Sequence, residues 1–158
     1  MEGDTKLGSQ NLEDLHARGD SMVRSYSYAK PSGVNAAKGN VFLGRGDYIK
    51  AGVQIVKKAG GENNLHYHTN SDSFWMVLKG RVKFYGPGDV LFGEYGPQEG
   101  IFTPVFSRYW FENAGEEDLE ILHVTARVDP NIQHSGRTDL EAQKFKVHTA
   151  HTFDARKD

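Results

Sequence analysis

The chain has 158 residues, with 19 basic and 21 acidic side chains, a formal net charge of -2 and no cysteine. This balance excludes nucleic acid as the expected partner, and the lack of cysteine excludes disulfides, zinc ribbons and thiol nucleophiles. The start of the sequence is acidic, unlike a signal peptide, and no run approaches the roughly 18 apolar residues of a membrane helix. We therefore expect a soluble, cytoplasmic, single-domain protein that does not bind membranes.

Residues 1–40 predict an N-terminal arm with one short helix. Ser9 is the expected N-cap, Leu12 and Leu15 are its apolar positions, and Gly19 is the expected stop. The stretch 26–40 is rich in small residues and predicts irregular structure, docked either on the domain or on a partner subunit.

Residues 41–128 predict a β-barrel. Apolar residues alternate with a period of two, as in half-buried strands, and glycine-rich turns separate the runs. The expected strands are 49–55, 65–68, 74–78, 81–85, 90–92, 101–106, 109–112 and 119–126. Short strands at this spacing indicate a sandwich, jelly roll or small barrel, and the absence of an internal repeat indicates one barrel.

Residues 129–158 form a polar C-terminal extension. Thr138 and Glu141 have the spacing of a capping box, which predicts a short helix. Phe145 and Val147 alternate with lysines, which favours a strand. Both readings stay open.

His66 and His68 form the histidine pair with the clearest chemical meaning. Residues i and i+2 of a strand point to one face, so both imidazoles would enter one space. Two neutral imidazoles suit a divalent transition metal such as iron, manganese, nickel or zinc. The alternative is an exposed strand with two solvated histidines.

The surroundings of this pair resemble the cupins. Gly60 precedes His66 by the spacing of the first cupin motif, and Gly80 closes that motif after a buried strand. The second motif is matched in register by Pro104, Tyr109 and Asn113. The resemblance spans about residues 41–126 and implies an all-β, jelly-roll barrel.

The sequence departs from the cupin pattern at four positions. The acidic ligand of the first motif falls at Ser73, with Asp72 beside it, and the histidine of the second motif is Tyr109. Gln98 and Phe106 replace the two glycines of the second motif. We therefore expect His66, His68, Asp72 and Tyr109 as candidate ligands, with Tyr109 alternatively a catalytic acid–base group or a buried aromatic residue.

The expected substrate pocket is aromatic. Ser73 and Trp75 share the ligand-facing side of one strand, and Phe111 shares the corresponding side with Tyr109. His123 is either a pocket residue that replaces the missing ligand or a hydrogen-bonded core histidine.

The resemblance implies dioxygenases, isomerases, decarboxylases and lyases. The leading hypothesis is a metal-dependent enzyme that performs dioxygenase-type or Lewis-acid chemistry on a small organic molecule at His66 and His68. A metal-free, epimerase-like enzyme that uses Tyr109 and a non-catalytic small-molecule or sugar-binding protein are the alternatives. A homodimer is expected, because the apolar residues of the arm have no core of their own and an open sheet edge favours a partner.

Overall fold

The computed structural model describes residues 11–59, 62–140 and 150–158. Within these ranges the chain forms an α-helix, α1 (Leu12–Ser21), one 3-10 turn, η1 (Pro87–Asp89), and a series of strands. The strands are β1 (Lys38–Arg45), β2 (Ile49–Val56), β3 (His66–His68), β4 (Ser71–Lys79), β5 (Val82–Tyr85), β6 (Leu91–Tyr95), β7 (Gly100–Thr103), β8 (Trp110–Asn113), β9 (Leu119–Arg127), β10 (Arg137–Asp139) and β11 (His151–Asp154).

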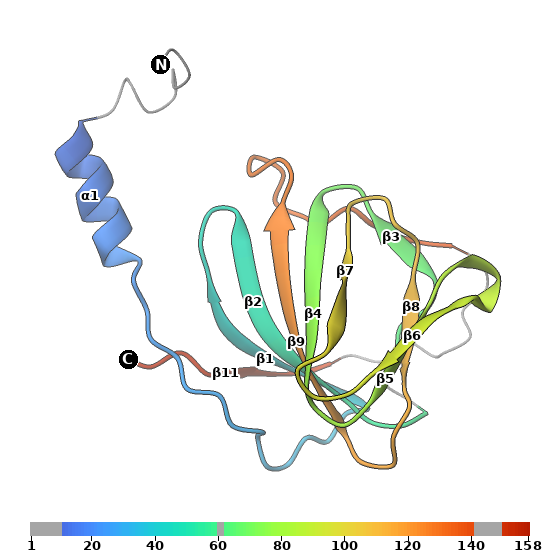
Figure 1. Ribbon diagram of the computed structural model, residues 1–158. Helices are drawn as coiled ribbons and strands as arrows, with labels where there is room; N and C mark the ends of the chain where they lie inside the picture. The colour runs from blue at the N-terminus through green and yellow to red at the C-terminus, as the bar shows by residue number, and fades with distance from the viewer. Residues whose placement is uncertain (1–10, 60–61, 141–149) are drawn as a thin grey trace.

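The strands form two facing sheets, as Figure 1 shows. The larger sheet has the order β11-β1-β2-β9-β4-β7, the smaller has the order β6-β5-β8, and β3 pairs with β10. All pairings are antiparallel except that of β1 with β11. The predicted all-β jelly roll is confirmed, and each expected strand is present with small shifts of its ends.

An aromatic core fills the space between the two sheets. Alternate residues of β4 and β9 face inward, so Trp75, Val77 and Ile121 are almost completely buried. They pack against Phe84 and Phe111 of the smaller sheet. This burial of large apolar side chains is the main stabilising term expected for such a barrel.

A second apolar cluster lies on the outer face of the larger sheet. Val41, Val53 and Ile55 pack there beneath Val34 of the arm and Phe153 of β11. The apolar alternate residues of β2 therefore face outward, and its polar alternate residues face the interior of the barrel.

The N-terminal arm docks on its own barrel. The α1 helix begins at the N-cap Asn11, whose side chain accepts a hydrogen bond from the Glu13 backbone, and Ser9 lies outside the described residues. The helix runs two residues past Gly19 and projects away from the barrel (Figure 1). Further along, the Tyr28 hydroxyl donates to Glu120 at 2.5 Å, which ties the arm to β9.

The C-terminal extension contributes strands to the barrel. Thr138 lies in β10, which pairs with β3, whereas Glu141, Phe145 and Val147 lie outside the described residues. β11 completes the larger sheet beside β1. The extension is thus part of the same folded unit as residues 41–128. No helix in the described part of the chain is both long and apolar enough to span a membrane.

Candidate metal centre and the adjoining cavity

β3 brings the two histidines together. The backbones of His66 and Tyr109 exchange two hydrogen bonds, of 3.1 and 3.0 Å, and this bridge fixes β3 against the start of β8. The imidazole rings of His66 and His68 meet edge to face, with centroids 5.0 Å apart. The i, i+2 spacing therefore gives the shared space that the sequence predicted.

The His66 ring is oriented as a ligand would be. Its Nδ1 lies 2.5 Å from the carbonyl oxygen of Asn64. A carbonyl only accepts hydrogen bonds, so Nδ1 carries the proton and Nε2 keeps its lone pair. The side chain is 1% exposed. Burial, assisted by the charge of Arg137, lowers the pKa of His66 to about 3, so the ring is neutral at physiological pH.

His68 is half-buried, and its Nδ1 lies 3.0 Å from the Ser135 hydroxyl. Burial and the nearby Arg137 lower the pKa of His68 below its ordinary value. Two neutral imidazoles with second partners on their Nδ1 atoms are suited to metal ligation.

Tyr109 lies beside His66, with ring centroids 4.5 Å apart. The residue is 2% exposed, and burial raises the pKa of the phenol above its ordinary value. At neutral pH the side chain is therefore a neutral phenol inside the core. It would ligate a metal only if the metal displaced its proton.

Asp72 is placed away from the histidines. Its side chain is exposed on the outer face of β4, where one carboxylate oxygen accepts from the Val105 backbone at 2.8 Å. The period of two along β4 turns Asp72 outward because Ser73 faces inward. The structure therefore removes Asp72 from the candidate ligand set. Across residues 11–59, 62–140 and 150–158, no group of three or more His, Cys, Asp or Glu side chains is arranged to hold a metal ion.

His123 is a hydrogen-bonded residue rather than a free ligand. Its ring stacks on Trp75, with centroids 3.6 Å apart and planes 7° from parallel. Nδ1 lies 3.3 Å from the Gln54 amide nitrogen, and Nε2 lies 3.1 Å from the Ser73 hydroxyl. Both ring nitrogens are thus engaged, and burial lowers the pKa of His123 to about 3.

The backbone of the second motif is kept although its glycines are not. Gln98 and Phe106 have φ values of 71° and 68°, in the left-handed region that favours glycine. A non-glycine residue there is disfavoured by roughly 1–2 kcal/mol. The two positions therefore have a backbone conformation that glycine would adopt more easily than the residues present.

Residues 52–125 match the family model of the cupin domain. This part of the chain is a cupin domain. No curated protein matches the chain.

The cupin domain is similar to several solved structures. A double-stranded β-helix protein from Klebsiella pneumoniae has a TM-score of 0.56 and 16% identity, over 73% of this chain and 92% of that chain. The cupin domain of Cnp3 from Schizosaccharomyces pombe has a TM-score of 0.53 and 19% identity, over 64% and 73%. KdgF from Halomonas sp. has a TM-score of 0.52 and 12% identity, over 68% and 89%. At these identities the likeness concerns the fold.

The predicted aromatic pocket is filled by the core of the cupin domain. Ser73, Trp75 and Phe111 are 3%, 2% and 0% exposed, and the indole of Trp75 donates to Thr103 at 3.0 Å. These side chains are buried and pack against one another, and none of the three is in the lining of the cavity described below. This is a correction, because period-two reasoning identifies the inward face of a strand but not whether that face is packed.

A cavity of about 800 Å³ lies beside this core instead. Residues of β11, β1, β2 and β9 form much of its wall. Of the predicted site residues, His68 and His123 line it. Sequence reasoning missed its polar lining, which includes Lys50, Gln54 and Arg127. The sequence signal that could have indicated this lining is the presence of polar residues, Lys50 and Gln54, at alternate positions of β2.

Proposed function

We propose that this protein is a metal-dependent enzyme that acts on a small organic molecule, with one first-row transition metal held by His66 and His68. The observation that carries this proposal is the orientation of His66. Its Nδ1 is committed to the Asn64 carbonyl, which leaves Nε2 as the donor atom in the space shared with His68.

The donor chemistry fits a transition metal. Neutral imidazoles suit iron, manganese, nickel and zinc, and two nitrogen donors leave open positions for water and substrate. Asp72 faces away and His123 is engaged by two partners, so neither belongs to the proposed set. A bound metal of this kind supplies Lewis-acid activation or, with iron, oxygen chemistry.

The side chains around the pair have separate tasks in this proposal. Asn64 orients His66, and Ser135 contacts His68. His68 lines the cavity, so an organic molecule in the cavity would reach the site from the side of His68. The burial of His66 keeps bulk water from that side of the site.

The metal-free acid–base alternative has less support. It needs a proton carrier that touches the substrate, but Tyr109 is buried in the core. Tyr109 is not among the residues that line the cavity.

The test is elemental analysis of untagged protein supplied with iron, manganese, nickel and zinc. We expect one metal per chain in the wild type, and only background metal in His66→Gln and His68→Gln. The matched control is His134→Gln. His134 is exposed, so this substitution removes one imidazole from the chain but leaves His66 and His68 in place. Circular dichroism would show that each variant is folded.

Two outcomes are decisive. Wild-type protein with no more metal than the two histidine variants would overturn the proposal. Tyr109→Phe is expected to keep its metal, because burial raises the pKa of the phenol and keeps it neutral. Loss of the metal in this variant would identify Tyr109 as a third ligand.

A further inference from the structure

The rim of the cavity has a row of polar residues set by strand register. Arg45 of β1 lies opposite Lys50 of β2, and Lys50 lies opposite Thr125 of β9. The next inward-facing row contains Phe42 and His123, with a glycine between them on β2. Exposed cations therefore stand at the rim, above a half-buried interior.

The side-by-side cations need an explanation. Like charges directly opposite in an antiparallel pair destabilise a sheet. The Lys50 ammonium lies 5.9 Å from the centre of the Phe42 ring, so it is directed over the inner face of the sheet. Arg127, at the end of β9, lines the same cavity, and its guanidinium donates to Gln133 at 3.3 Å.

Among the residues that the structure describes, no acidic side chain is paired with these three cations, Arg45, Lys50 and Arg127. No Asp or Glu is among the described residues that line the cavity. The charges of Arg45 and Arg127 act on the Asp47 carboxylate from a distance, but this carboxylate forms its ion pair with Arg18, at 2.7 Å. Arg156 also lines the cavity, but it is paired with Asp154 at 2.7 Å. Within the described part of the chain, Arg45, Lys50 and Arg127 form no ion pair with a carboxylate.

Among the described residues, the interior of the cavity holds one charged group, the guanidinium of Arg156, which lies 4.7 Å from the centre of the Phe42 ring and is neutralised by Asp154. The Phe42 ring offers an apolar surface and Gln54 offers a neutral polar group, and His68 and His123 lie beside them in the lining. A complementary ligand would thus carry negative charge at one end and a short uncharged body at the other.

We propose that this cavity binds a small organic anion, with its carboxylate or phosphate group at Arg45, Lys50 and Arg127 and its body extending toward His68. This inference rests on the proposed metal-dependent function at one point only, because it takes the bound anion to be the substrate. Binding itself depends on residues that are not metal ligands.

The experiment uses three probes with the same ring: benzoate, phenyl phosphate and the neutral benzamide. Calorimetric titration at low salt, where charges are least screened, is performed on wild-type protein dialysed against a chelator. We expect at least one anion to bind at one site per chain, and benzamide not to bind. The anion that binds with the higher affinity identifies the preferred head group, carboxylate or phosphate.

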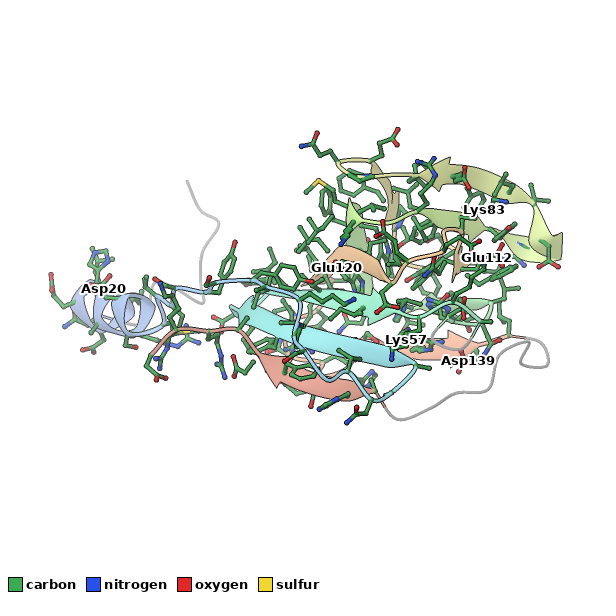
Figure 2. All side chains as sticks on the ribbon, turned by 90° about the horizontal axis from the view of Figure 1, so that it is seen from below. Asp20, Lys57, Lys83, Glu112, Glu120 and Asp139 are labelled. Atoms are coloured by element: carbon green, nitrogen blue, oxygen red, sulfur yellow. The ribbon has the colours of Figure 1, made fainter. Side chains whose placement is uncertain are left out.

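The variants Lys50→Gln and Arg127→Gln are expected to weaken anion binding by roughly tenfold or more. The matched control is Lys83→Gln, which changes the net charge equally. Lys83 lies on β5 of the smaller sheet, where it is paired in register with Glu94 and with Glu112. Figure 2 shows Lys83 and Glu112 on this sheet, so the variant should leave binding unchanged.

The proposal is overturned if neither anion binds, if benzamide binds as well as benzoate, or if Lys83→Gln weakens binding as much as Lys50→Gln. It is also overturned if the anions bind only after metal is added and Lys50→Gln has no effect. Because the titration uses metal-free protein, failure of the metal proposal would leave its result intact.

Discussion

Asn70 joins the β3–β4 turn to the segment that leads into β10. Its side chain is 3% exposed. The amide nitrogen lies 3.1 Å from the Asp129 carbonyl, 3.3 Å from that of Ile132 and 3.1 Å from that of His134. The amide oxygen accepts from the Asp129 backbone at 2.7 Å. This segment also carries Ser135, which contacts His68, so Asn70 supports one wall of the site.

We predict that Asn70→Ala lowers the free energy of unfolding by about 3 kcal/mol. The amide has two hydrogens for three carbonyls, so it makes two full donated bonds and one accepted bond, each with a net value of about 1 kcal/mol. With a urea m-value of about 2 kcal/mol/M, the unfolding midpoint should fall by roughly 1.5 M. Asn70→Asp should lower the free energy of unfolding by at least as much, because a carboxylate would face three carbonyl oxygens.

Urea denaturation followed by circular dichroism measures both quantities. The matched control is Asn131→Ala, an exposed residue of the same segment, which should stay within about 0.5 kcal/mol of the wild type. If Asn70→Ala unfolds at the same midpoint as this control with an unchanged m-value, the reasoning from hydrogen bonds is refuted.

Three further predictions concern stability and assembly. Gln98→Gly should raise the free energy of unfolding by about 1 kcal/mol, because φ at Gln98 is 71°, and Gln98→Ala should give no gain. His123 has a pKa of about 3 in the folded protein and an ordinary value of 6.5, so the unfolded chain takes up the proton first and stability falls as pH drops from about 6.5 toward 3. His123→Gln should make the free energy of unfolding depend less on pH in this range, whereas His16→Gln, at an exposed position, should not. Equal dependence on pH in the two variants would contradict the role given to His123. Light scattering should give a homodimer of the 17.7 kDa chain, and a monomer mass at micromolar concentration would disprove it.

The sequence alone was enough to predict the strands between residues 49 and 126 and the shared face of His66 and His68, but not β1, β10 or β11. Both follow from short-range geometry, because a period of two is a property of each strand by itself. The register of the second motif was also readable, and the left-handed backbone at Gln98 and Phe106 agrees with it. Ser9 as N-cap lay outside the described residues, and the helix continued beyond Gly19 because a single glycine does not end a helix by itself.

Only the tertiary structure decided which face of β2 lines the cavity. Alternation shows that Val53 and Gln54 face opposite sides, but the arm and β11 cover the side of Val53. The apolar face was therefore buried from outside the barrel, and the polar face with Lys50 and Gln54 was left to line the cavity. The contact of Ser135 with His68 joins residues 67 positions apart. Such pairings depend on how distant segments pack, and local sequence periodicity carries no information about that packing.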